Sequence, residues 1–306
     1  MSAAIGIIAT ALVLGSAYAL VGLGYNLCFV ALRTINFAQG QMYMVAAFVY
    51  AELFAHGYHI VPAVLIACAI GAAMGLVIER GIISPVMNRG FTHGNLQASV
   101  LGTVAASIVI QEIANRLWGS TILPAPAFFG SGFVRIGTAV ITYGQMTAVG
   151  GAIVLYILLW LLTRKTTVGL YLRATAANPV VTSLQGVNNR LVVSFAFSLA
   201  GVITAMAGIL VSPLNGVSTS TGIELATYGM LAALVGGLGR MSGVIPAGYA
   251  MGFVEILVSY YWTSQYPDLV LYVVIFVTLV GPSLIKGVRD SQSVKRARRQ
   301  VPNAGS

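Results

Sequence analysis

The sequence predicts an all-α fold, a polytopic bundle of transmembrane helices with about eight to nine spans. Of the 306 residues, 58% are hydrophobic and only 8% are charged, whereas a soluble domain carries about 25% charged residues. The mean hydropathy is +0.90. A chain of this composition cannot cover itself with a water-facing surface, so it must lie in a membrane. The formal charge of +9 need not indicate nucleic-acid binding, because cytoplasmic loops of membrane proteins collect Lys and Arg.

Nine stretches come close to the roughly 20 apolar residues that cross about 30 Å of hydrocarbon. They lie at about 4–31, 38–56, 60–79, 96–117, 139–162, 191–212, 222–239, 243–263 and 267–285. The stretch at 222–239 is the weakest, because it is short and rich in glycine. The polar break at Arg33–Asn36 either separates two spans or interrupts one. No Lys or Arg precedes Arg33, so the first stretch lacks the positive start of a signal peptide and reads as a retained span.

The basic residues predict the orientation of these spans. If the C-terminal tail is cytoplasmic, alternation through nine spans places all but Arg116 and Arg135 of the 16 Lys and Arg residues inside. This asymmetry predicts an outer N-terminus and a cytoplasmic C-terminus. The predicted orientation would be unchanged if two of the nine stretches did not span the membrane, but not if one did not, because both termini would then lie on the same side. It gives a transmembrane domain at 1–286 and a basic cytoplasmic tail at 287–306, which reads as solvated or, alternatively, as a contact for anionic lipid.

Aromatic and small residues fit this arrangement. Trp118 and Trp262 fall at outer ends of spans and Trp160 at an inner end, where amphipathic rings anchor at the headgroups. The stretch 118–138 is interrupted by proline and glycine, so it reads as an extracytoplasmic loop or hairpin. Glycines spaced four apart predict close contact between helices. Such pairs are Gly71 with Gly75, and Gly248 with Gly252.

The segment 163–190 is the longest polar interruption, and it carries basic residues but no acidic one. Its interior predicts a short helix with both ends marked. Asn178 is a good N-cap, Pro179 suits the first helical position, and Gly186 can take the left-handed stop conformation. An apolar edge is supplied by Val180, Val181 and Leu184. Such a helix between two spans is either a docking element or an ordinary positive-inside loop with a turn of helix.

The sequence offers no constellation for catalysis. The motifs HExxH and GxSxG are absent, as is the P-loop pattern GxxxxGK[ST], so we expect no catalytic residue and no ATP site in this chain. His56 and His59 could form a metal pair, but no third ligand accompanies them, and we expect no metal site. Cys28 and Cys68 lie in apolar runs and read as buried small hydrophobic residues.

Polar residues recur at every fourth position of the fourth span. On a helix they form a slowly drifting stripe. The stripe consists of Ser99, Thr103, Ser107, Gln111 and Asn115. We favour a polar lining for a solute path, because the two amides are larger than packing requires. The alternative is hydrogen bonding between packed helices. Glu255 lies deep in the eighth span, where an ionisable group is a functional candidate, whereas Glu112 can reach the headgroups or Arg116.

Four strings, in order along the chain, carry a family resemblance. They are RTINFAQGQMYM at 33–44; Gly169, Arg173-Ala174, Asn178 and LQGVN at 184–188; LVGGLG at 234–239, followed by Gly243 and Gly248; and GPSLIKG at 281–287. The first is similar to R-x-I-N-F-A-x-G-x-x-Y-M and the last to R-P-x-G-L-x-G. With these strings the chain resembles the branched-chain amino-acid type of ABC transporter permease, and within it the LivH-type half.

The resemblance implies a division of labour among subunits. The chain would be the permease subunit of an importer in the cytoplasmic (inner) membrane of a bacterium, paired with a second, LivM-like permease. Two ATPase subunits would bind ATP, and an extracytoplasmic solute-binding protein would deliver the solute. A cytoplasmic loop of such permeases fits a groove on an ATPase. This assigns ATPase coupling to Arg173, Asn178, Pro179, Val181, Leu184 and Gly186. The chain itself would need no cofactor.

The resemblance also brings the first string into the translocation pathway. The predicted pathway consists of Asn36, Gln39, Gln41, Ser99, Thr103, Ser107, Gln111 and Glu255. Gln39 stands where the family usually has His, and Gln41 where Glu is common, while Gly281 and Leu284 depart from the closing pattern. The solute therefore stays open among a branched-chain or other amino acid, urea and a short amide.

Two other hypotheses stay open. Gly-Leu-Gly occurs at both 22–24 and 237–239, and repeated interrupted spans often bracket the midplane site of a secondary transporter. Ion coupling, however, usually needs more buried acids than Glu255. A passive channel is compatible with the polar stripe alone.

Overall fold

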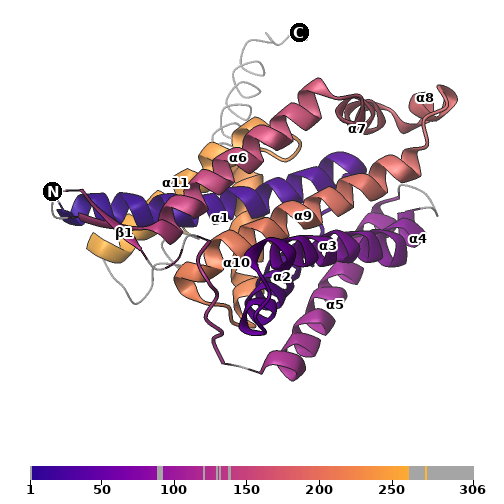
Figure 1. Cartoon of the computed structure of the whole chain (residues 1–306). Helices are drawn as coiled ribbons and strands as arrows, with labels where there is room; N and C mark the ends of the chain where they lie inside the picture. The colour runs from indigo at the N-terminus through magenta and orange to yellow at the C-terminus, as the bar shows by residue number, and fades with distance from the viewer. Residues whose placement is uncertain are drawn as a thin grey trace, which may run out of the picture. The chain divides into compact units, whose positions relative to one another are not determined.

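The structure is a computed structural model that describes residues 2–87, 92–119, 121–128, 130, 132–136, 139–261 and 273. Helices dominate it (Figure 1). The α helices are α1 (Ser2–Leu32), α2 (Gln39–Ala55), α3 (Ile60–Ile78), α4 (Ser84–Met87), α5 (His93–Trp118), α6 (Tyr143–Lys165), α7 (Thr167–Ala177), α8 (Pro179–Leu184), α9 (Asn189–Asn215), α10 (Thr221–Gly236) and α11 (Met241–Tyr261). A π-helical turn, η1 (Glu79–Ile83), joins α3 to α4, and β1 (Phe133–Ile136) pairs with β2 (Ala139–Thr142). Residues up to Ile256 belong to one compact unit.

Six helical stretches in the described residues are long and apolar enough to cross a membrane. They are Ile5–Leu32, Ile60–Met87, Gly94–Trp118, Tyr143–Lys165, Asn189–Asn215 and Met241–Tyr261. The predicted stretches 38–56 and 222–239 form α2 and α10, which are shorter, at 17 and 16 residues. The predicted span at 267–285 falls, apart from residue 273, outside the described residues, as does the tail at 287–306. The chain is thus a mostly helical, multi-pass membrane protein.

A β-hairpin at 133–142 corrects two expectations. The predicted all-α fold includes this small antiparallel sheet, in which Phe133 lies opposite Thr142. The span predicted at 139–162 begins as a helix only at Tyr143. The cause is local: the Thr142 side chain accepts a hydrogen bond from the Gln145 backbone N–H, and the Gln145 side chain accepts one from the Thr142 N–H. This capping box fixes the helix start after the strand.

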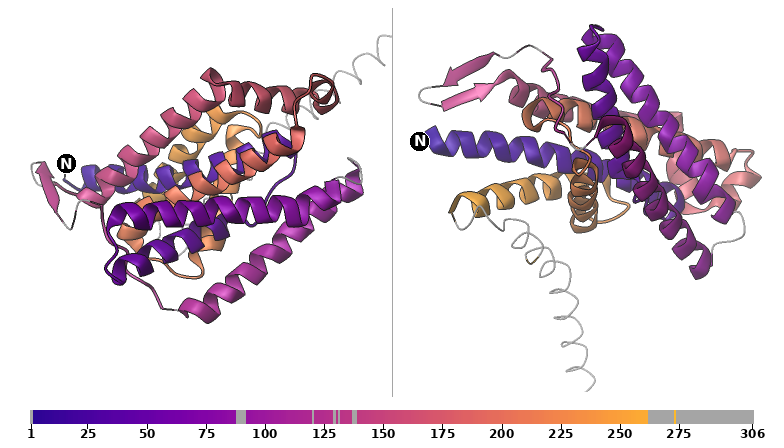
Figure 2. Two further views of the ribbon diagram at one scale, coloured as in Figure 1. Left: turned by 45° about the vertical axis from the view of Figure 1, so that its right-hand side comes forward. Right: turned by 90° about the horizontal axis from the view of Figure 1, so that it is seen from below.

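Helix α9 lies among α1, α2, α3 and α6 (Figures 1 and 2). In the most apolar stretches of α9 and α1, 67% and 56% of the residues are buried, against 17% and 22% for the stretches in α5 and α6. Helices α5 and α6 therefore turn most of their apolar surface outward, as helices that contact lipid or another membrane protein do.

Backbone contact between α3 and α9 depends on glycine. A Cβ at Gly71 would lie 2.8 Å from the carbonyl oxygen of Gly201, and one at Gly201 would collide with the carbonyl oxygen of Gly71. Gly75, one turn along α3, meets the α9 backbone in the same way. Helix α11 approaches α1 at Gly248 and Gly252. The close contacts predicted from both glycine pairs are therefore confirmed.

Candidate functional site

A non-helical break at residues 33–38 separates α1 from α2. It starts at the exposed Arg33, whose φ of +54° is the left-handed conformation that costs a non-glycine residue about 1–2 kcal/mol. The Arg33 guanidinium carbon lies 5.6 Å from the centroid of the Phe29 ring. Irregular backbone inside a membrane protein persists only where other protein groups satisfy its hydrogen bonds. The partners of this break therefore identify the interior site.

Three residues of α5 supply one row of these partners. The hydroxyls of Thr34 and Ser99 are 3.0 Å apart, and the Phe37 N–H donates to Thr103 Oγ1 at 3.2 Å. One turn further along, the Gln41 side-chain nitrogen donates to the Ser107 hydroxyl at 3.0 Å. Ser99, Thr103 and Ser107 are all buried. The stripe predicted from four-residue spacing thus runs beside the break and the start of α2, and its hydroxyls take part in contacts between helices.

The side-chain amide of Gln39 joins the break to α9. Gln39 is fully buried. Its nitrogen donates to the Ala200 carbonyl oxygen at 2.9 Å and to Thr204 Oγ1 at 2.6 Å. Its oxygen accepts from the Asn36 side-chain nitrogen at 3.2 Å, while Asn36 Oδ1 accepts from the Ala38 N–H. We use the name Gln39 cluster for Asn36, Gln39, Gln41, Ser99, Thr103, Ser107 and Thr204.

One strong acceptor in the Gln39 cluster is unused. Gln41 Oε1 is buried, and in the described part of the chain it has no hydrogen-bond partner. A Cβ placed on Gly222 of α10 would lie 2.8 Å from this oxygen, so α10 closes over it. A buried acceptor without a donor destabilises the fold by about 1–3 kcal/mol. Gln41 Oε1 is therefore a buried acceptor whose hydrogen-bonding capacity is unused in the described part of the chain.

The other predicted pathway residues lie at different contacts. The Gln111 side-chain nitrogen donates to the Thr219 carbonyl oxygen at 3.3 Å, and Asn115 is exposed, so the stripe leaves the interior as α5 continues. Glu255 accepts a hydrogen bond from Tyr18 Oη at 2.5 Å, where α11 meets α1. Glu112 pairs with Arg116 at 3.1 Å on the exposed face of α5. The structure thus groups six of the eight predicted pathway residues and holds Gln111 and Glu255 elsewhere.

A buried carboxyl that the sequence did not single out lies at the far end of α3. Glu79 is buried in η1, and its Oε2 accepts from the Ser194 hydroxyl at 2.7 Å. The apolar stretch that ends at residue 79 predicts a water-facing end of a span, but the helix continues through the π turn to Met87. The adjacent Arg80 made a loop the natural expectation. A hydrophobic pattern that resumes at Ile82 and Ile83 was the available signal.

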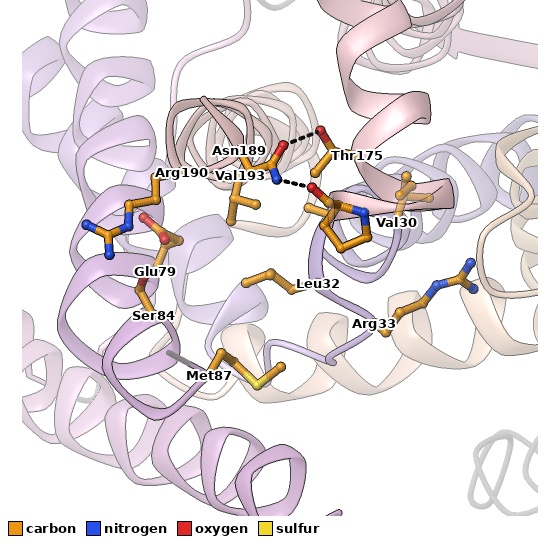
Figure 3. Close-up of a pocket in the computed structure, with 13 residues that line it drawn as sticks. Val30, Leu32, Arg33, Glu79, Ser84, Met87, Thr175, Asn189, Arg190 and Val193 are labelled. Carbon is orange, nitrogen blue, oxygen red and sulfur yellow. Dashed lines mark hydrogen bonds between the residues drawn. The ribbon is translucent and has the colours of Figure 1, made fainter. Parts of the chain in front are cut away.

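Glu79 lines a pocket of about 360 Å³ between α8 and the break (Figure 3). Arg33, Pro179 and Arg190 contribute to its walls. Figure 3 shows Asn189 between two partners: its side-chain nitrogen donates to the Pro179 carbonyl oxygen at 2.6 Å, and its oxygen accepts from the Thr175 hydroxyl at 3.2 Å. Asn189 thereby fastens the start of α9 to both α7 and α8.

Helix α8 confirms the short helix predicted from the sequence. Asn178 Oδ1 accepts from the N–H groups of Val180 and Val181, at 3.1 and 3.2 Å, and Pro179 occupies the first turn. Gly186 follows the helix with φ of +81°, the left-handed conformation in which glycine has no Cβ penalty. The apolar edge is exposed: Val180, Val181 and Leu184 show 66%, 48% and 82% of their surface.

Helix α7 precedes α8 and was not predicted. The Thr166 hydroxyl caps it by accepting from the Gly169 N–H at 3.2 Å. Leu172 and Thr175 are buried, so Thr166 and this spacing were the available signal. Arg173, one of the predicted coupling residues, lies on α7. It does not line the pocket in Figure 3 but a second cavity, between α1 and α6. The structure therefore gathers five of the six predicted coupling residues at α8.

Comparison with known proteins gives a consistent family. Residues 7–279 match the model of the permease component of branched-chain amino acid transport systems. The chain is 29% identical over 297 residues to the high-affinity branched-chain amino acid transport system permease protein LivH of Escherichia coli K12, covering 92% of this chain and 94% of that one. It is 28% identical over 300 residues to BraD of Pseudomonas aeruginosa, covering 92% and 95%. It is also 28% identical over 287 residues to the galactofuranose transporter permease protein YtfT of Escherichia coli K12, covering 89% and 80%.

Proposed function

This chain belongs to the family of permease components of branched-chain amino acid transport systems, and we propose that α8 couples it to an ATPase subunit and that the Gln39 cluster lies on the path of its solute. As a member of this family it is a transmembrane permease subunit of an ABC importer. Such a subunit moves a solute with energy supplied by separate ATPase subunits.

The capped, exposed helix α8 is the observation that carries the coupling role. Most apolar side chains of a short surface helix pack against the protein, but Val180 and Leu184 project away from it. Asn178 and Asn189 hold the helix by hydrogen bonds at its start, so the apolar tip is presented on a rigid support. Arginine and lysine without acidic residues surround it in 163–190. This surface suits a hydrophobic groove with an acidic rim on an ATPase subunit.

Helix α9 offers a direct route from α8 to the Gln39 cluster. Asn189, at its first turn, binds α7 and α8, and Ala200 and Thr204 of the same helix bind Gln39. The 11 residues from Asn189 to Ala200 span about 17 Å at 1.5 Å per residue. A displacement of α8 by an ATPase would therefore move the partners of Gln39 without an intervening loop.

The chemistry of the cluster favours a small polar solute with N–H donors. Its side chains are amides and hydroxyls, and the unused acceptor is Gln41 Oε1. We propose a branched-chain or other amino acid as the solute, with urea or a short amide as the alternative. An extracytoplasmic solute-binding protein would deliver it, and a LivM-like permease and two ATPase subunits would complete the complex. The proposed topology has nine spans, an outer N-terminus and a cytoplasmic C-terminus in a bacterial inner membrane, by the positive-inside rule.

The coupling role is tested with two variants that introduce the same charge one residue apart. Leu184→Glu places a carboxylate on the apolar tip of α8, whereas Gln185→Glu places it on the exposed residue that follows. We expect Leu184→Glu to lower co-purification of the cognate ATPase about tenfold or more, as removal of an interface anchor does, and Gln185→Glu to change it by less than about twofold. Equal recovery of the ATPase with both variants would contradict the assignment.

Reconstitution in liposomes tests the importer function against its alternatives. The chain with its cognate permease, ATPases and binding protein should accumulate solute only when ATP is supplied. Uptake by the isolated chain under a proton or sodium gradient would instead indicate a secondary transporter, and leakage without a gradient would indicate a channel.

The position of Gln41 on the solute path is tested by a pair of substitutions. Gln41→Leu should raise the KM for the transported solute, while Asn115→Leu, a change of an exposed amide on α5, should leave this KM unchanged.

A further inference from the structure

A second cavity, of about 430 Å³, lies between α1, α6, α7 and the 239–242 segment. It is separate from the pocket in Figure 3, whose walls come from α1, η1, α4, α7 and the starts of α8 and α9. The coupling role of α8 and the path through the Gln39 cluster make no use of it. Its lining combines arginines with apolar side chains, and each kind of residue is informative about a ligand.

Three arginines from three separate elements line the cavity. Arg164 lies in the last turn of α6, Arg173 on α7, and Arg240 in the connection between α10 and α11. The cavity lining includes no acidic residue. Within the described residues none of the three arginines has a carboxylate oxygen within 4.0 Å of its side-chain nitrogens. Three like charges at one cavity repel one another unless an anion lies among them.

Close packing of α7 onto α6 keeps two of these arginines at the same cavity. Thr166 ends α6 and caps α7. A Cβ on Gly169 would collide with the carbonyl oxygens of Leu162 and Thr163, so only glycine lets α7 fold back against the end of α6. The packing of the α7 backbone on α6 therefore fixes the positions of Arg164 and Arg173 at the cavity. Positive charge that is merely spread along cytoplasmic loops would not require such packing.

The wall of the cavity comes from two apolar helices. It is lined by Leu23, Leu27 and Val30 of α1 and by Tyr156 and Leu159 of α6. Trp160 also lines the cavity and is 42% exposed, which fits an amphipathic ring at the level of lipid headgroups. A soluble anion would gain nothing from such a wall. A phospholipid matches both parts, with its phosphate at the arginines and its acyl chains along α1 and α6.

We propose that this cavity binds an anionic phospholipid at the end of the bundle that carries α8. Basic pockets between transmembrane helices on the cytoplasmic side are suited to phosphate headgroups. Arginine is suited to the task because its planar guanidinium donates two parallel hydrogen bonds to a phosphate. A lipid held there would join the α6–α7 connection to the 239–242 segment, two parts of the chain that are far apart in sequence.

The test compares two double variants of the full chain that lose the same charge. Arg164→Gln with Arg240→Gln removes two cavity arginines but leaves Arg173 in place. Arg80→Gln with Arg190→Gln removes two arginines that do not line this cavity. Each chain is placed in phosphatidylcholine nanodiscs, phosphatidylglycerol is added in steps, and bound lipid is counted by native mass spectrometry.

We expect phosphatidylglycerol to be retained over phosphatidylcholine by the unaltered chain and by the control. One arginine near a headgroup changes anionic lipid binding by about fivefold, so the cavity variant should lose about 25-fold. Equal loss in both double variants would overturn the site, because it would show a general effect of charge. Inorganic phosphate that displaces the lipid at millimolar concentration would also overturn it, because the acyl chains would then contribute nothing.

A fluorescence measurement keeps the test valid if the cavity variant folds poorly. Trp118→Phe with Trp262→Phe leaves Trp160 as the single tryptophan of the three in the chain. Brominated phosphatidylglycerol at low mole fraction should quench Trp160 at least about threefold more than brominated phosphatidylcholine at the same fraction, because one anionic lipid is held beside the ring. Equal quenching by the two lipids would contradict the proposal.

Discussion

The Gln39 cluster and helix α8 hold polar groups in opposite ways. Gln39 is fully buried, and its partner Thr204 is 165 residues away in the sequence. Asn178 is exposed, and its partners Val180 and Val181 are two and three residues away. The cluster exists only when the break at residues 33–38, α2, α5 and α9 are assembled. The cap of α8 forms from a single short segment.

Because of this difference, mutations in the Gln39 cluster and mutations in α8 should have different effects. A change in the cluster disturbs several helices at once, so it should lower the stability of the whole chain. A change in α8 disturbs one exposed turn, so it should alter the contact with a partner and leave the bundle intact. The following variants test this separation, beginning with the largest expected effect.

Gly40→Ala should produce the greatest loss of stability, and Gly186→Ala is its counterpart at α8. A Cβ on Gly40 would collide with the Gly222 carbonyl oxygen, which is a backbone atom and not the end of a flexible side chain. We expect a loss of about 3 kcal/mol. At Gly186 space is open and only the left-handed φ opposes a side chain, so the loss should be about 1 kcal/mol. Unfolding of the detergent-solubilised chain measures both, and a larger loss at Gly186 would reverse the comparison.

Gln39→Leu should come second, with Gln185→Leu as the matched substitution at the end of α8. Leucine cannot donate to Ala200 and Thr204 or accept from Asn36. At about 0.6 kcal/mol for each hydrogen bond between transmembrane helices, the loss should be about 2 kcal/mol. Gln185 is exposed, so its replacement should change stability by less than about 0.5 kcal/mol. If the two variants unfold at the same temperature, the buried amide does not hold the helices together.

Asn178→Ala should weaken the α8 cap by about 1 kcal/mol and leave global unfolding unchanged. The two N–H groups at the start of α8 would lose their acceptor. Hydrogen exchange at residues 180–184 should increase, and the affinity for the cognate ATPase should fall about fivefold. A lower unfolding temperature of the whole chain would show that α8 is part of the cooperative unit.

Among the changes in the Gln39 cluster, Ser107→Ala should have the smallest effect on stability, about 0.6 kcal/mol. It removes the acceptor of the Gln41 side-chain nitrogen and keeps the α5 packing. Freed from Ser107, the Gln41 amide can turn, so the KM for the transported solute should change more than the unfolding temperature. An unaltered KM would argue against a position of Gln41 on the solute path.

These two regions also show what a sequence can predict in this fold. Asn178, Pro179 and Gly186 predict α8 correctly, because a cap and a stop act within one turn. The spacing of Ser99, Thr103 and Ser107 predicts a shared helix face, but not that the face meets the break after α1, because those contacts span about 66 residues. The irregular break itself has no periodicity from which its hydrogen bonds could be inferred.

Other differences follow from the same cause. The start of α6 was placed four residues early, because an apolar strand and an apolar helix look alike over so short a run. Glu79 was overlooked because a charged residue at the end of an apolar stretch normally marks water, and here a π turn carries the helix onward. The start of α6 and the burial of Glu79 both depend on contacts with other parts of the chain, which a short stretch of sequence does not contain.

The reciprocal contact of Gly71 with Gly201 has a mechanical consequence. Where two helices touch through side chains, rotamer changes let one slide past the other, but here main-chain atoms of one helix rest directly on those of the other. We therefore expect α3 and α9 to move together as one rigid body. Relative movement of the helices is then expected at other seams of the bundle, where larger side chains separate the backbones.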